Sequence, residues 1–164
     1  MNDFYSEHLV KKRKEAKDLL VKIILVILTV FCFLFCRAIP LGIILAFVLL
    51  AVDIFIFRML DIEYEYMYLN GELDIDMIMH KERRKKLCTV NIKDVEMVAP
   101  TGSPEIAMHK GVQTLNYSSK MPNAETYEII CNAGGSRKKI IFEPKQEVIE
   151  DMWMRAPRKV IRKK

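Results

Sequence analysis

The chain has 164 residues, of which 51% are hydrophobic and 29% charged, and its formal net charge is +5. This length leaves room for one folded domain of ordinary size beside an apolar segment, and it excludes a second such domain. A basic balance suits an anionic membrane surface or nucleic acid, and the long apolar segment favours the membrane, so no nucleic-acid partner is expected.

Residues 1–18 combine apolar side chains at helical spacing with a basic run at residues 11–14. The apolar set is Phe4, Tyr5, His8 and Leu9. One interpretation is an interfacial helix on the cytoplasmic side, with aromatic side chains toward lipid and basic ones toward head groups. The other is a frayed, charged tail.

Residues 19–60 form an almost uninterrupted apolar segment, which is broken near Arg37 and Pro40. One helix of this length would measure roughly 60 Å, about twice the thickness of a hydrocarbon core, so the segment must fold back. The sequence therefore predicts a transmembrane hairpin with spans at about 19–36 and 38–58, and not a cleaved signal peptide.

Lysine and arginine residues gather at the open end of this hairpin, whereas the turn carries Arg37 alone. Arg58 and a further basic cluster follow the second span. The basic residues that precede or begin the first span are Lys11, Lys12, Arg13, Lys14, Lys17 and Lys22. Positive charge is retained on the cytoplasmic side during insertion. We therefore expect a multi-pass protein of the plasma membrane with both termini in the cytoplasm.

Each arm of the hairpin carries one internal charge, Lys22 on the first and Asp53 on the second. Both lie about fifteen residues from a bend near residues 38 and 39, hence at similar depth, which predicts an ion pair between them. Ionisable residues inside a bilayer are often functional. We favour a structural role over a proton or ion path, because both residues lie near the interface and two helices are too few to line a path.

After residue 60 the hydrophobic period changes from helical to two. Alternating segments at 62–69 and 72–79 flank Asn70-Gly71, which predicts a β-hairpin with a type I′ turn. A basic turn at 80–86 and a short helix from Pro104 are also expected, with further strands at 87–92, 94–99, 113–119, 126–132 and 138–143.

A C-terminal helix is expected at about 144–155, with Val148, Ile149, Met152 and Trp153 on one face. The whole pattern predicts an α+β membrane protein. Its cytoplasmic domain, at 61–157, has about seven strands in a small antiparallel sheet or barrel that the helix closes with Trp153 as the plug. The basic tail at 158–164 is expected to be disordered.

Five segments of the sequence carry a resemblance to a known family: residues 64–66, 70–76, 83–100, 117–119 and 141–157. With the order of elements, they resemble the bacterial pleckstrin-homology-like (PH-like) membrane proteins. More closely, they resemble an uncharacterised family of small Gram-positive proteins with a two-span hairpin and a PH-like cytoplasmic domain. The resemblance implies a PH-like fold and brings no catalytic residues with it.

Members of the wider superfamily that bind phosphoinositides hold the head group with basic residues around the loop between the first two strands. Here the sequence places Asn70-Gly71, which is tight and uncharged, in that loop. A basic cluster instead follows the second expected strand and either binds anionic lipid or a partner, or simply keeps a turn soluble. Its members are Lys81, Arg83, Arg84, Lys85 and Lys86.

The sequence contains no specific motif for catalysis or for a metal. The four cysteines are expected to be small apolar residues, because Cys32 and Cys36 find no Cys or His on the second arm. The three histidines are scattered, and neither a P-loop nor a Gly-x-Ser-x-Gly elbow occurs. We expect no enzyme activity, no metal and no cofactor.

Two functions compete on this basis. The first is a non-catalytic, membrane-anchored PH-like module that binds a protein partner or an anionic lipid surface at the cytoplasmic face. The alternative is an accessory or scaffold subunit of a membrane transport or envelope-stress complex, in which the hairpin is the interacting part.

Overall fold

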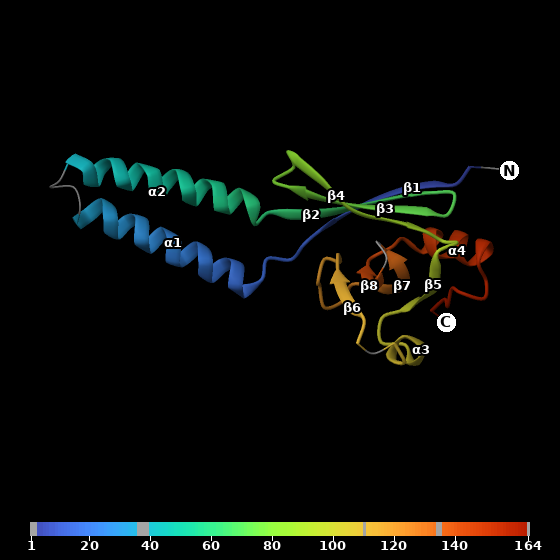
Figure 1. Ribbon diagram of the computed structural model, residues 1–164. Helices are drawn as coiled ribbons and strands as arrows, with labels where there is room; N and C mark the ends of the chain where they lie inside the picture. The colour runs from blue at the N-terminus through green and yellow to red at the C-terminus, as the bar shows by residue number, and fades with distance from the viewer. Residues whose placement is uncertain (1–2, 36–39, 110, 134–135, 164) are drawn as a thin grey trace.

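The computed structural model describes residues 3–35, 40–109, 111–133 and 136–163. Two long helices, the hairpin, form one end of the molecule, and strands with two shorter helices, the β domain, form the other (Figure 1).

The hairpin consists of α1 (Ala16–Phe35) and α2 (Pro40–Met59), which lie side by side (Figure 1). Both are long and apolar enough to cross a membrane, and only 11% and 17% of their apolar windows are buried. A core helix of a soluble protein would be mostly buried. The two helices therefore fit the expected two-span anchor, while Cys36 and Arg37 of its turn lie outside the described residues.

A small residue, an aromatic pair and a polar pair lie between α1 and α2. Ala46 is 1% exposed, and its small side chain lets the helices approach closely. Phe33 meets Phe47 edge to face, with ring centroids 6.3 Å apart. The Thr29 hydroxyl donates a hydrogen bond of 2.6 Å to Oδ2 of Asp53, which is 4% exposed.

The structure does not bring Lys22 and Asp53 together. Asp53 pairs with Thr29, whereas the Lys22 ammonium lies 5.3 Å from the centroid of the Phe57 ring. Side chains on a helix lean toward its N-terminus, so residues at equal depth on antiparallel helices lean in opposite directions. Lys22 therefore leans toward the β domain and Asp53 toward the turn, although the two residues lie at similar depth.

The β domain contains two four-stranded sheets and not a closed barrel in the part of the chain described. Sheet A is antiparallel in the order β1 (Tyr5–Lys11), β2 (Ile62–Leu69), β3 (Glu72–Met79) and β4 (Arg83–Asn91). Sheet B has the order β5 (Val95–Pro100), β7 (Tyr127–Ala133), β8 (Ser136–Phe142) and β6 (Gln113–Asn116). The β6–β8 pair is parallel, unlike the antiparallel sheet expected. The short helix is α3 (Pro104–Ala107), and the C-terminal helix is α4 (Gln146–Arg155).

The expected interfacial helix in residues 1–18 is wrong, because residues 5–11 form β1 and pair with β2. The buried residues Ser6 and Val10 alternate with exposed Tyr5, Glu7 and Leu9, which is the period of a strand. This strand is the eighth, beyond the seven expected. The hairpin is thus an insertion between two paired strands, and the β domain begins before it.

The turn expected at Asn70-Gly71 is confirmed, and the strands around it have the predicted bounds. Asn70 and Gly71 have φ of 48° and 94°, the left-handed values that a type I′ turn requires. The turn also holds the start of β1, since the Asn70 side-chain oxygen accepts a hydrogen bond of 3.0 Å from the Phe4 N–H.

The C-terminal segment closes the core between the sheets. The plugging side chains of α4 are Ile149 and Met152, at 0% and 2% exposure, while Trp153 lies partly exposed at the rim under the Arg162 guanidinium.

The tail is not disordered over its described residues, because Val160 is 3% exposed and the Ile161 N–H donates to the Val98 carbonyl at 2.7 Å. Two apolar residues within the basic tail suffice for this contact.

Candidate functional site

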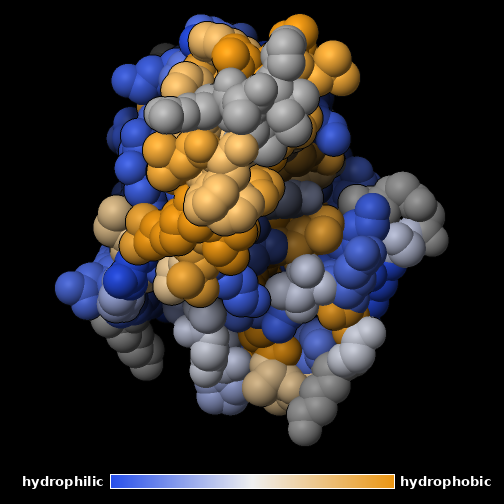
Figure 2. Space-filling view, turned by 90° about the vertical axis from the view of Figure 1, so that its left-hand side faces the viewer, coloured by the Kyte–Doolittle hydropathy of each residue, from blue (hydrophilic) through white to orange (hydrophobic). Residues whose placement is uncertain are grey.

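Two junctions connect the hairpin to the β domain, and both carry basic residues. The α1 junction comprises residues 12–18 with residues 116–120, and the α2 junction comprises residues 55–61 with residues 79–83. Seen from the hairpin end, hydrophilic residues of the β domain surround the apolar helices (Figure 2). Charges at this end of the domain are therefore the ones closest to the hairpin.

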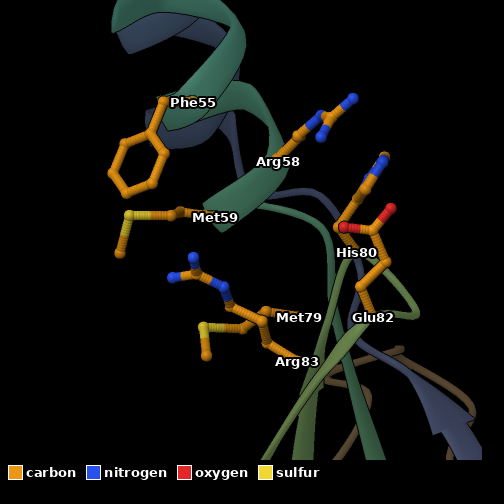
Figure 3. A pocket seen from close by; sticks show the side chains of 7 residues that line it. All are labelled: Phe55, Arg58, Met59, Met79, His80, Glu82 and Arg83. Carbon is orange, nitrogen blue, oxygen red and sulfur yellow. The ribbon is translucent and has the colours of Figure 1, made fainter.

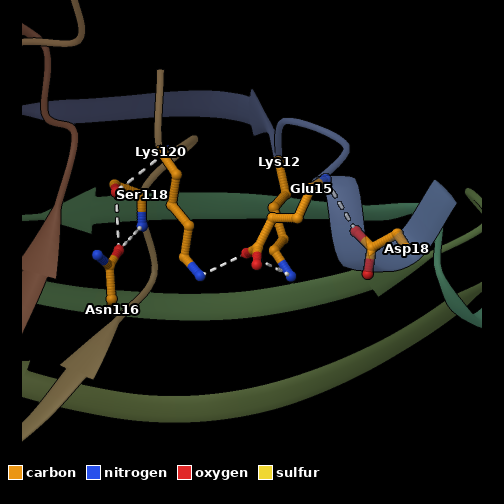
Figure 4. Close-up of polar contacts among 6 residues, drawn as sticks. All are labelled: Lys12, Glu15, Asp18, Asn116, Ser118 and Lys120. Atoms are coloured by element: carbon orange, nitrogen blue, oxygen red, sulfur yellow. Dashed lines mark hydrogen bonds and ion pairs between the residues drawn. The ribbon is translucent and has the colours of Figure 1, made fainter. Parts of the chain in front are cut away.

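The α1 junction is closed by ion pairs with one carboxylate (Figure 4). Glu15 Oε1 lies 2.6 Å from Lys120 Nζ and 3.6 Å from Lys12 Nζ, and the hydrogen bond from Lys120 lowers the pKa of Glu15. The Arg13 N–H donates to the Ser119 carbonyl at 2.8 Å. The start of α1 is therefore tied to the loop that follows β6.

Local hydrogen bonds support both sides of this tie (Figure 4). Asp18 accepts a bond of 3.1 Å from the Glu15 N–H, which caps the first turn of α1. On the loop, Asn116 Oδ1 accepts bonds from the Ser118 N–H at 3.0 Å and the Ser118 hydroxyl at 2.7 Å. The α1 junction is thus a structural clamp in which Lys12 and Lys120 share one carboxylate partner, Glu15.

The α2 junction instead contains a pocket of about 130 Å³. It is lined by Phe55, Arg58, Met59, Met79, His80, Glu82 and Arg83. The β2–β3 register explains why these residues meet, since Ile62 lies opposite Met79 and the His80 N–H donates to the Asp61 carbonyl at 2.8 Å. Residues just before β2 therefore face the turn that follows β3.

The pocket has an apolar side and a basic side. Figure 3 shows the Arg83 side chain directed between Met59 and Met79, with Phe55 on the same side of the pocket. Arg58 and His80 point to the other side (Figure 3). Within the described ranges, none of the three basic side chains takes part in an ion pair or side-chain hydrogen bond, in contrast to Lys12 and Lys120.

The basic cluster expected at residues 81–86 is divided by strand alternation, because β4 begins at Arg83 and not after the cluster. Arg84 lies 2.5 Å from Glu65 and 3.8 Å from Asp76, and Lys86 lies 2.9 Å from Asp74.

Burial raises the pKa of Glu65, which is 5% exposed on the outer face of sheet A. Glu65 and Asp76 lie opposite each other in the β2–β3 register, so Arg84 offsets a like-charge pair. Arg84 and Lys86 are thus neutralised by the protein itself. Of the five cluster residues, the structure brings only Arg83 into the pocket, while Lys81 and Lys85 are exposed beside it.

A family model described as "Bacterial PH-like domain (DUF6106)" matches residues 2–162. The chain belongs to this bacterial PH-like family. No curated protein and no solved structure matches it. The matched range includes β1, the hairpin and both sheets, which confirms the resemblance found in the sequence. PH-like domains are typically non-catalytic modules.

In this PH-like domain, the loop between the first two strands is not Asn70-Gly71, as expected from sequence, but the segment between Lys11 and Ile62. Asn70-Gly71 joins β2 to β3. The correction follows from β1, which precedes the hairpin. The basic run at residues 11–14 therefore lies at the start of the first loop.

Sequence reasoning missed the pocket, although one signal could have found it. The predicted hairpin about Asn70-Gly71 already aligns Ile62 with Met79, so Arg58 and Met59 fall beside His80 and the residues after it. The Glu15–Lys120 pair had no comparable signal, because its members are 105 positions apart.

The described residues contain no group of three or more His, Cys, Asp or Glu side chains placed to hold a metal ion. Burial raises the pKa of the Cys88 thiol to about 12 and also raises the pKa of Cys131. Both thiols are therefore protonated at neutral pH and poor nucleophiles.

Proposed function

We propose that this protein is a non-catalytic, membrane-anchored PH-like module whose β domain engages the anionic lipid surface at the cytoplasmic face of the plasma membrane. One observation carries the proposal: the hairpin leaves and re-enters the same sheet between paired strands. The Lys12 N–H donates to the Ile62 carbonyl at 3.0 Å, so both ends of the hairpin start from neighbouring points.

Short connections support a close approach of the β domain to lipid. Only residues 12–15 separate β1 from α1, and residues 60–61 separate α2 from β2. With both helices in a bilayer, these connections are too short for the domain to move away from the head groups. Cations held at that distance are each worth about 1 kcal/mol of attraction to an anionic leaflet.

The distribution of charge supports the orientation. Lys and Arg residues concentrate at the β-domain end of the hairpin, and the opposite turn carries Arg37 alone. By the positive-inside rule, the β domain and both termini face the cytoplasm.

A cysteine at Glu72, which is exposed at the start of β3, tests this orientation. We expect a membrane-impermeant maleimide to label the Glu72→Cys protein only after the cells are opened, compared with the parental protein as the background. Labelling in intact cells would contradict the cytoplasmic assignment.

Engagement of anionic lipid is tested by hydrogen exchange of the full-length protein in nanodiscs of phosphatidylglycerol or phosphatidylcholine. We expect slower exchange of backbone amides at both junctions in phosphatidylglycerol at low salt, and a smaller difference at high salt. Equal exchange in the two lipids would overturn the proposal.

A further inference from the structure

The geometry points to a binding site for a single anionic phospholipid in the pocket of the α2 junction. The phosphate lies against Arg83, with Arg58 at the other side of the pocket, and an acyl chain runs along Phe55 and Met59. This inference rests on the proposed function, because it requires the pocket to lie at the membrane surface.

The apolar side of the pocket continues the surface of a membrane-spanning helix. Phe55 is 51% exposed and Met59 is 47% exposed, and both belong to the last turns of α2. Met79 adds an apolar side chain from the end of β3. A lipid seated here keeps its acyl chain within the apolar layer and brings its head group to the β domain.

The basic side of the pocket suits a phosphodiester. Arg83 is the first residue of β4, so its backbone is held by the sheet, and its side chain points between Met59 and Met79 (Figure 3). A guanidinium presents five donors in a planar fork that matches phosphate oxygens. In the described part of the chain this guanidinium has no carboxylate partner to displace.

The charge balance favours an anionic lipid over a zwitterionic one. Arg58 lies in the last turn of α2, where it offsets the roughly half negative charge of a helix C-terminus. Glu82 is the one carboxylate among the described lining residues, and it lies beside His80, on the opposite side from Arg83 (Figure 3). The charge of Arg83 is therefore left for a ligand.

The dimensions argue against a folded protein partner in the pocket itself. A helix with its side chains is about 10 Å across, which exceeds what a pocket of about 130 Å³ admits. A phosphate with its glycerol oxygens is of the right size, and the chains remain outside the pocket along α2.

Native mass spectrometry of the full-length protein tests the site, in maltoside micelles with equal amounts of phosphatidylglycerol and phosphatidylcholine. We expect the wild-type protein to retain one phosphatidylglycerol at least tenfold more often than one phosphatidylcholine. The Arg58→Gln, Arg83→Gln double variant should lose this preference to within about twofold.

The matched control is the Lys81→Gln, Lys85→Gln double variant, which removes the same charge from exposed positions outside the pocket. It should keep the preference of the wild type. An equal loss in both double variants would overturn the pocket and leave a diffuse attraction, consistent with the proposed function.

Three further outcomes would also overturn the site. If the wild type shows no preference in micelles while its hydrogen exchange depends on phosphatidylglycerol, the pocket is wrong and the proposed function stands; if neither depends on lipid charge, both fall. If equimolar glycerol 3-phosphate displaces the bound phosphatidylglycerol, the site binds a free phosphate and not a lipid.

Discussion

At the α1 junction one carboxylate, Glu15, binds both Lys120 and Lys12, whereas at the α2 junction Arg58 and Arg83 surround an open pocket with no ion pair in the described chain. Both junctions lie at the same end of the β domain. The difference shows that the basic side chains beside the hairpin are of two kinds: Lys12 and Lys120 hold the fold together through Glu15, and Arg58 and Arg83 remain available to a ligand.

Strand β4 contains the same division within neighbouring residues. Arg84 is neutralised by Glu65 and Asp76, while Arg83, on the other face, lines the pocket. A run of like charges in a sequence therefore does not mark one surface when it lies on a strand. The partners of each residue decide its role.

Removing the hairpin breaks both junctions at once, and of the changes considered it should alter the behaviour of the protein in solution the most. Lys12 and Ile62 are neighbours in sheet A, so replacing residues 13–61 with Asn-Gly should join β1 and β2 by a two-residue turn. We expect a protein that is soluble without detergent and unfolds cooperatively, measured by circular dichroism during thermal unfolding.

The fragment 61–164 is the comparator, because it lacks the hairpin and also lacks β1. It loses buried Val10 and the contact of Phe4 with Tyr68, and it leaves the edge of β2 without a partner. We expect it to aggregate. Equal stability of this fragment and the Asn-Gly variant would show that β1 is not part of the domain.

Single substitutions in β4 test whether Arg83 and Arg84 differ in their contribution to stability. Arg84→Gln should lower the free energy of unfolding by about 2 kcal/mol, since buried Glu65 and Asp76 then face each other without a cation. Arg83→Gln should change it by less than about 0.5 kcal/mol, because this residue has no partner within the described chain. Denaturant unfolding in micelles, followed by fluorescence of Trp153, measures both.

A second change controls for the mechanism of the Arg84→Gln effect. Adding Glu65→Gln to Arg84→Gln removes one of the two uncompensated carboxylates and should restore part of the lost stability. Equal effects of Arg83→Gln and Arg84→Gln would show that the two arginines do not differ as described.

Acid should open the α1 junction. This is the smallest of the expected changes, because it is local to the Glu15 clamp. Lys120 lowers the pKa of Glu15, so the clamp is fully present above the ordinary pKa of this carboxyl and is lost as pH falls through its lowered value. The NMR signal of the Arg13 amide, which bonds to Ser119, should shift over this acidic range. In a Glu15→Gln protein that signal should not follow the same titration; an identical shift would contradict the clamp.

Local patterns in the sequence predict much of the fold. The apolar period gives the hairpin helices, and Asn70-Gly71 with its alternating flanks gives β2 and β3 with their bounds. For β1, the sequence instead suggests a helix. That prediction is based on the spacing of Phe4, Tyr5, His8 and Leu9, whereas the buried positions are Ser6 and Val10. Only pairing with β2, which begins 51 positions after β1 ends, decides between the helical and the strand period.

The site was less predictable, because it depends on which charges are neutralised. Basic character at residues 81–86 is evident from sequence, but the pairing of Arg84 with Glu65 requires the register of three strands. In the same way, Lys22 and Asp53 occur at matching positions of the hairpin, yet the lean of side chains on antiparallel helices separates them.

The β domain is built across the hairpin, with β1 paired to β2. Glu7 and Met67 lie opposite each other in that pairing, between ladder hydrogen bonds, where Cα atoms are about 4.5 Å apart and a disulfide can form. In a protein whose natural cysteines are replaced by serine, the Glu7→Cys, Met67→Cys pair should oxidise within single chains in native membranes. Failure to form this intramolecular disulfide, or its formation only between chains, would contradict the account.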